Sequence, residues 1–232
     1  EEQARRLEAA VGGETFHRIT GNSCDGSLPL LKLMWLLEQE PETAGQIAHV
    51  LISSKDYLIA RLTGVFCGDV TACSTAGAMD IQAERWDDSL LEAAGVPAAW
   101  FPKLYRPGDI VGTVQPDCGC GLCPGTVVLA GIGDAGATTL ASGIHRPGEV
   151  NLNLGTSGWV AAVSGTVCPS QGVFNLAAAE PHTYLNVAPF LNAGNVHRWI
   201  AGLLHGGEAD YPSLTALLEE SVPGSHGVLC LP

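Results

Sequence analysis

The residue with the clearest capacity for chemistry is Asp134, which lies in the glycine- and alanine-rich turn GIGDAGA (residues 131–137). The apolar run 127–129 before the turn predicts a short buried strand, and the alanine- and threonine-rich segment after it predicts a helix that ends near Gly143. A carboxylate at a helix N-terminus stays ionised, as a base that accepts a hydroxyl proton must. Asp134 is therefore predicted to be a buried general base. The alternative is an acid that only caps its helix through its side chain.

The same turn supports a second interpretation. Gly131-x-Gly133-x-x-Gly136 is the phosphate-binding pattern of dinucleotide-dependent enzymes. Asp134 argues against it, because a pyrophosphate would then meet a carboxylate at the helix N-terminus where it needs bare N–H groups. The next predicted strand also ends without the acidic residue that would bind the ribose. An NAD-dependent dehydrogenase is therefore kept as the less favoured enzyme class.

A second glycine-rich turn follows the predicted strand 150–154 and leads into another strand. It consists of Gly155, Thr156, Ser157 and Gly158. Its small residues allow close backbone approach, and the Thr156 hydroxyl can donate to a phosphate oxygen. A plain hairpin turn is the alternative. An acid and a hydroxyl-bearing glycine loop, each at the end of one of two neighbouring strands, would suit phosphoryl transfer.

Together the two turns resemble the catalytic-base turn and the phosphate loop of the FGGY carbohydrate kinases, most closely of their xylulokinase-like branch. The segment 27–39 fits that family's first signature at each constrained position (S-x-P-x-x-K-L-x-W-L-x-E-Q). Further similarity follows in the family's order at 55–58 (KDYL), 61–64 (RLTG), 86–88 (WDD) and 192–195 (NAGN), with Trp199 after it. The resemblance covers nearly the whole chain.

The resemblance implies a kinase that uses ATP and Mg²⁺ to phosphorylate a hydroxyl of a sugar or polyol, with a pentulose such as xylulose favoured. The site residues that it implies are Asp134 as general base, Gly155, Thr156, Ser157 and Gly158 as the phosphate loop, Trp159 beside the sugar, and Gly194 and Arg198 near the nucleotide, with no metal ligand. For Trp159, a place in the core is the alternative. Most of the rate would come from positioning and charge neutralisation, as for phosphoryl transfer in general.

Alternating predicted strands and helices indicate the α/β class. The resemblance implies two RNase H-like domains of the actin and hexokinase type. Residues 1–145 would be most of the first domain without its opening strands and phosphate loop, and residues 146–232 the start of the second. Because the family's amino-terminal phosphate loop and carboxy-terminal adenine site are not in this sequence, we expect the chain alone not to phosphorylate. A non-catalytic sugar-binding or interaction fragment is therefore the other alternative.

Composition narrows the partners and the compartment. The 232 residues are 46% hydrophobic, so we expect a folded core. A formal net charge of −13 argues against nucleic acid and anionic membranes as partners. The resemblance implies a small-molecule sugar substrate. No apolar run is long enough to span a bilayer, and the first residues do not form a secretion leader. We therefore expect a cytoplasmic protein whose 8 cysteines are reduced. A homodimer is a possible assembly.

The remaining patterns predict further elements. Helices are expected over 1–11, from Pro29, over 56–62, from 88 to Gly95, from 194, and over 213–221. The helix over 56–62 is expected to be capped by Ser53 or Ser54 and closed by Gly64. Strands are expected at 49–52 and 184–188, and loops at 97–109 and 164–183.

The sequence also predicts roles for several side chains and segments outside these elements. Trp35 is interpreted as a core anchor, and Asp69 and Asp80 as capping or surface acids. The small, polar segment 69–80 that they bound suits close packing near a ligand cleft. The glycine-rich stretch with Cys118, Cys120 and Cys123 is interpreted as a loop, with zinc binding as the alternative because a fourth ligand would have to come from elsewhere.

Overall fold

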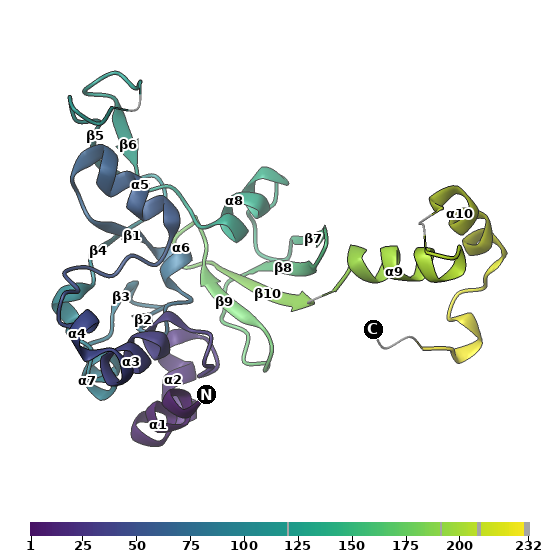
Figure 1. The fold of residues 1–232 in the computed structure, drawn as a ribbon, viewed down its shortest axis with the longest axis horizontal. Helices are drawn as coiled ribbons and strands as arrows, with labels where there is room; N and C mark the ends of the chain where they lie inside the picture. The colour runs from purple at the N-terminus through teal and green to yellow at the C-terminus, as the bar shows by residue number, and fades with distance from the viewer. Residues whose placement is uncertain (120, 191, 208–209, 230–232) are drawn as a thin grey trace. The chain divides into compact units, whose positions relative to one another are not determined.

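The structure is a computed structural model that describes residues 1–232 except 120, 191, 208–209 and 230–232 (Figure 1). The chain divides into two compact units. The first unit is Glu1–Asn151 with Ala161–Ala188, and the second is Leu152–Val160 with Pro189–Pro232. The boundary predicted at 145/146 concerns the two domains of the resembling family, and it stays a prediction.

The helices are α1 (Glu2–Val11), α2 (Gly13–Thr20), α3 (Pro29–Gln39), α4 (Pro41–Ala44), α5 (Ser54–Thr63), α6 (Val70–Cys73), α7 (Asp88–Ala94), α8 (Asp134–Ala141), α9 (Gly194–Leu204) and α10 (Tyr211–Glu220), with single 3-10 turns at Ala98–Trp100 and Ser225–Gly227. The predicted helices are thereby confirmed, within a few residues at their ends. Among the described residues, no helix is long and apolar enough to cross a membrane.

The strands are β1 (Cys67–Asp69), β2 (Met79–Asp80), β3 (Arg85–Trp86), β4 (Lys103–Tyr105), β5 (Ile110–Thr113), β6 (Val127–Leu129), β7 (Val150–Leu154), β8 (Gly158–Ser164), β9 (Phe174–Ala177) and β10 (Tyr184–Phe190). In the largest sheet the order is β7-β8-β10-β9. β9 and β10 are antiparallel, with Phe174 opposite Val187 and Ala177 opposite Tyr184. β1 pairs with β4 in parallel, and β2–β3 and β5–β6 form antiparallel pairs.

The main core of the first unit lies where α1, α2, α3 and α7 pack together. Leu7, Phe16, Leu30 and Leu91 are at most 1% exposed there. Burial of each such side chain stabilises the fold by roughly 1.5–3 kcal/mol. A second cluster joins α6, β2 and β9, and a third joins α5, β1 and the β5–β6 hairpin. These clusters fix α5, α6 and β9, the elements that line the candidate site described below.

Local sequence signals explain where the key helices begin and end. Ser53 accepts the N–H of Lys55 at 3.4 Å, while Asp56 Oδ2 accepts the N–H of Ser53 at 3.1 Å, so α5 opens with a reciprocal cap. Gly64 closes α5 in the left-handed conformation (φ 74°), which glycine adopts without strain. The predicted cap and stop of this helix are confirmed.

A fully buried pair of asparagines ties the end of α2 to α6 and β9. The Asn22 side-chain amide donates to carbonyls of Thr20, Ser74 and Asn175 at 3.0–3.1 Å, and its Oδ1 accepts the N–H of Asn175 at 2.8 Å. The Ser74 hydroxyl also accepts the N–H of Ala177 at 2.8 Å. Because buried amides left unpaired are costly, this satisfied network fixes β9 against α6.

Several expectations are wrong. Residues 49–52 do not form a strand, whereas the predicted loops contain strands β4 and β9. Trp35, expected to be a core anchor, is 48% exposed. The buried face of α3 is the opposite one, which carries Leu30, Leu31 and Met34.

The predicted strand 127–129 exists as β6, but its two outer residues are about half exposed because β5 is its one partner among the described strands. β6 and β7, expected to be neighbours, lie in different sheets.

Candidate active site

The first unit contains a pocket of about 520 Å³ that includes Asp134. It is lined by Ile52, Ser53, Ser54, Thr71, Ala72, Thr75, Gly133, Asp134, Ala135, Phe174, Leu176 and Val187. The start of α5, the short α6, the first turn of α8 and strands β9 and β10 supply these residues. The prediction that residues 69–80 pack near a ligand cleft is therefore consistent with the pocket wall.

Asp134 is the first residue of α8, directly after the N-cap residue Gly133. It is exposed, so the expectation of a buried acid is wrong. Its Oδ1 accepts the N–H of Ala135 at 2.8 Å, and Asp134 is one of the residues that line the pocket. The group can therefore accept a proton from a hydroxyl placed in the pocket.

Two glycines in this turn are required by close packing. A Cβ on Gly133 would lie 3.2 Å from the backbone nitrogen of Ala72, and a Cβ on Gly136 would lie 2.5 Å from Cδ1 of Ile132. The turn therefore rests directly on the backbone of α6, which is also a wall of the pocket. This packing explains the glycine spacing without a dinucleotide.

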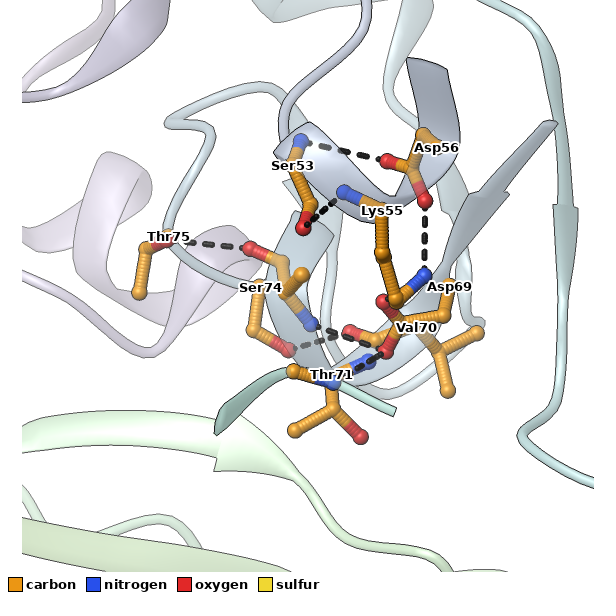
Figure 2. A network of polar contacts seen from close by, with 10 residues as sticks. Ser53, Lys55, Asp56, Asp69, Val70, Thr71, Ser74 and Thr75 are labelled. Atoms are coloured by element: carbon orange, nitrogen blue, oxygen red, sulfur yellow. Dashed lines mark hydrogen bonds and ion pairs between the residues drawn. The ribbon is translucent and has the colours of Figure 1, made fainter. Parts of the chain in front are cut away.

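Behind the pocket lies a buried ionic cluster that sequence reasoning missed. Figure 2 shows the ammonium of Lys55 between two carboxylates, with Nζ 2.6 Å from Oδ1 of Asp56 and 2.7 Å from Oδ2 of Asp69. Both aspartate side chains are 0% exposed, and Lys55 is 24% exposed. The sequence identified Asp69 only as a capping or surface acid. It does cap α6, accepting the N–H groups of Thr71 and Ala72 at 3.0 Å each.

The pKa values in this cluster follow from burial and charge. Burial raises the pKa of Asp56, and the hydrogen bond and charge of Lys55 only partly offset that effect. For Lys55, burial acts to lower the pKa, but the hydrogen bonds and charges of Asp56 and Asp69 outweigh it, so its pKa is raised. Lys55 therefore stays protonated at neutral pH and compensates the carboxylates.

The second unit contains the other predicted site residues. The loop Gly155–Gly158 joins β7 to β8, and Thr156 and Ser157 are exposed. In the part of the chain that the structure describes, neither of their hydroxyls has a protein hydrogen-bond partner, so both can donate to a ligand. Gly158 is buried, and the ring of Phe190 occupies the space that a Cβ at this position would need.

The N-terminus of α9 rests on this loop. The N–H of Gly194 donates to the carbonyl of Gly155 at 2.8 Å, and the N–H groups of Ala193 and Asn195 donate to the carbonyl of Thr156 at 3.0 and 3.3 Å. A Cβ on Gly194 would lie 2.7 Å from the oxygen of Gly155. The structure thus brings together the predicted phosphate loop and the predicted nucleotide residue Gly194.

Two predicted residues lie farther along the same elements. Trp159 is half-buried on β8, directly after the loop. Arg198 is on α9 and lines a shallow pocket of about 430 Å³ with Trp199 and Gly202. Their proposed contacts with sugar and nucleotide stay predictions.

Zinc binding by the cysteine cluster stays an untested alternative. Cys120 lies outside the described residues. Within the described ranges, no group of three or more His, Cys, Asp or Glu residues could hold a metal ion.

Comparison with known proteins decides the family. Residues 1–141, more than half of the chain, match the N-terminal domain of the FGGY family of carbohydrate kinases. The chain belongs to this family. The predicted fold class, the RNase H-like fold of actin and hexokinase type, is confirmed with it.

Individual relatives agree with this assignment. The chain is 34% identical over 233 residues to the xylulose kinase of Streptomyces rubiginosus, which covers 99% of this chain and 46% of that protein. It is 26% identical to the gluconokinase of Bacillus licheniformis, over 99% of this chain and 47% of that protein. The crystal structure of xylulose kinase from Rhodospirillum rubrum superposes with a TM-score of 0.91 and 31% identity, covering all of this chain and 48% of that one. The chain thus spans about half the length of the curated relatives that it matches.

Proposed function

We propose that this FGGY family member takes part in the ATP-dependent phosphorylation of a hydroxyl on a sugar or polyol. The observation that carries the proposal is the exposed carboxylate of Asp134 in a pocket whose walls also carry the side chains of Ser53, Ser54, Thr71 and Thr75. Hydroxyl-bearing side chains beside a carboxylate suit a substrate with several hydroxyl groups, because each can donate and accept hydrogen bonds. A ketose such as xylulose is favoured, since similar proteins include xylulose kinases.

In the proposed mechanism, Asp134 accepts the proton of the substrate hydroxyl as its oxygen attacks the γ-phosphoryl group of ATP. The Thr156 hydroxyl and the N–H groups of its loop would bind the transferred group. Trp159 would lie against the sugar, and Gly194 and Arg198 near the nucleotide. Mg²⁺ would enter with ATP and neutralise phosphate charge, since the described residues offer no cluster to bind it.

One feature supports our proposal of a reducing compartment, and another argues against the dehydrogenase alternative. Cys67 and Cys73 are buried thiols, and burial raises the pKa of both, so they are unreactive and compatible with the cytoplasm, our proposed location. The Asp134 side chain occupies the N–H of Ala135, a donor that a pyrophosphate at this helix end would need.

The test is a coupled assay on the product of the complete reading frame that encodes these residues. Mg-ATP is supplied with a panel of ketoses, aldonates and polyols, and ADP formation is followed. We expect ADP formation that depends on one sugar of the panel. Sugar-dependent reduction of NAD⁺ without ATP would support the dehydrogenase instead, and sugar binding without turnover would support the non-catalytic alternative.

A further inference from the structure

The buried cluster of Lys55, Asp56 and Asp69 has no part in the chemistry proposed above, yet it borders the pocket. Both oxygens of Asp69 are engaged. Oδ2 lies 2.7 Å from the Lys55 ammonium, and Oδ1 accepts the N–H groups that begin α6. Taking two carboxylates and an ammonium out of water is costly, so a cluster of this kind is weak evidence for stability alone.

One further bond leads from this cluster to the candidate base. The N–H of Gly133 donates to the same Oδ1 of Asp69, at 3.3 Å. Gly133 is buried and directly precedes Asp134. The Oδ1 atom of Asp69 therefore holds both α6 and the first turn of α8.

Packing of the same groups limits how the turn can move. Ala72 backs Gly133, since an added Cβ would lie 3.2 Å from three of its atoms. The aliphatic stem of Lys55 lies beside Gly131, where an added Cβ would lie 3.7 Å from Cδ. The turn is thus held by α6 on one side and by Lys55 on another, with the Asp69 carboxylate joining the two. An ionised acceptor gives shorter and stronger hydrogen bonds than a neutral one, which is a reason to keep a charged pair here.

We propose that Asp69, paired with Lys55, is a positioning residue that fixes the turn bearing Asp134 against the wall of the pocket. Asp69 does not touch the substrate. Its role is to hold the backbone from which the Asp134 carboxylate projects, so that the base keeps one position relative to the bound hydroxyl. The functional half of this inference rests on the proposed function, while the structural half does not.

The structural half is tested by amide hydrogen exchange, measured by NMR on the 232-residue chain. The variant Asp69→Asn leaves Lys55 paired with Asp56, so one positive charge faces one negative charge and folding should survive. We expect exchange at the amides of Gly133 and Asp134 to accelerate about 10-fold or more, since a hydrogen bond to a charged group is lost. Asp69→Ala should give a larger effect in the same direction.

A matched control is available in β2. Asp80 makes the same kind of turn, with Oδ1 accepting the N–H groups of Gln82 and Ala83 at 2.9 Å each. Among the described residues, no lysine forms an ion pair with Asp80, and Asp80 lies outside the pocket lining. Asp80→Asn should accelerate exchange at Gln82 and Ala83 and leave Gly133 unchanged. The buried amide of Leu30, which donates to Ala76 at 2.9 Å, reports global opening.

Two outcomes would overturn the inference. If Asp69→Asn accelerates only Thr71 and Ala72, Asp69 is a cap of α6 and nothing more. If Leu30 accelerates as much as Gly133, Asp69 acts on the whole unit and does not position the turn.

Kinetics then test the functional half on the complete gene product. Asp69→Asn should lower kcat at least 10-fold and leave KM for the sugar within about 3-fold, since positioning acts mainly in the transition state. Accelerated exchange at Gly133 with unchanged kcat would overturn the link to catalysis. A wild-type protein without sugar-kinase activity would instead contradict the proposed function, and the exchange result would still decide the structural half.

Discussion

Replacing Lys55 by Met should destabilise the first unit more than any surface ion-pair change. Methionine keeps much of the aliphatic stem that packs beside Gly131, so the change removes mainly the ammonium. The carboxylates of Asp56 and Asp69, both 0% exposed, would then have no positive partner.

The magnitude follows from that burial. Breaking a buried pair by removing one partner costs about 3–5 kcal/mol, because the remaining charge is left uncompensated. We expect the lower end, about 3 kcal/mol, since 24% of the Lys55 side chain is exposed and water can screen part of the charge. The control is Arg6→Met. Arg6 pairs with Glu38 at 2.5 Å, and 54% of the Arg6 side chain is exposed. Arg6→Met should therefore lower the free energy of unfolding by only about 0–1 kcal/mol.

The assay is urea unfolding followed by tryptophan fluorescence. Replacing Trp159 and Trp199 by Phe leaves tryptophans only in the first unit, so the signal reports that unit. A loss below about 1 kcal/mol for Lys55→Met, equal to that of Arg6→Met, would refute the reasoning about the cluster.

The pH dependence adds a check on sign. The folded-state pKa of Lys55 is raised above its ordinary 10.5, so its stabilising contribution is complete below that value. It is lost as the pH rises through the raised pKa. The difference in the free energy of unfolding between the wild type and Lys55→Met should therefore stay constant through neutral pH and narrow only above pH 10.5. A difference that narrows between pH 7 and about 9 would contradict this assignment.

Three further predictions follow from the loop and the buried thiols. Thr156→Val should leave folding intact and slow phosphoryl transfer by about one to two decades, for a lost charge-assisted bond of roughly 1.5–3 kcal/mol; unchanged steady-state kinetics would reduce the loop to a hairpin turn. Gly194→Ala should weaken the contact between α9 and the loop, because the new Cβ would lie 2.7 Å from the oxygen of Gly155, and faster exchange of the Gly194-position amide would show it. Burial raises the pKa of Cys67 to about 11 and that of Cys73 well above 9.0. Their contribution to stability is therefore complete below pH 9.0 and falls as the pH rises beyond that value. Between pH 9.0 and about 11, the free energy of unfolding should fall less in a Cys67→Ala variant than in the wild type.

Much of the local structure was predictable because its signals are short-range. The cap of α5 at Ser53 and its stop at Gly64 depend on residues within one helix, and both are present as predicted. The strand–turn–strand pattern around Thr156 was likewise readable from apolar runs and glycines. Asp134 could be singled out because it is the one charged residue in its turn.

What the sequence did not reveal depends on contacts between distant segments. Asp69 and Gly133 are 64 positions apart, and nothing local marks their hydrogen bond. β6 was expected to be buried from its apolar residues, but strand exposure depends on the partner strands, and it has only β5. One local signal could have indicated the ionic cluster. Lys55 and Asp56 are adjacent on the first turn of α5, just after the capping serine.

The exposure of Asp134 was missed for a related reason. A turn of small residues was taken to predict a buried acid, yet the same small residues let the turn pack closely on Ala72 while the carboxylate stays at the pocket. Close backbone packing and side-chain exposure are therefore compatible at this position.

The central claim is that Asp134 is the general base, and Asp134→Asn in the complete gene product tests it most directly. The amide keeps the size of the side chain and an oxygen for the N–H of Ala135, but it cannot take a proton. We predict that kcat falls by roughly 10²–10⁴-fold while KM for ATP stays nearly unchanged. Asp87→Asn, which alters a capping aspartate on α7 outside the pocket lining, should leave kcat near wild type. Near-normal turnover by Asp134→Asn would contradict the account and leave Asp134 as an acid that only caps α8.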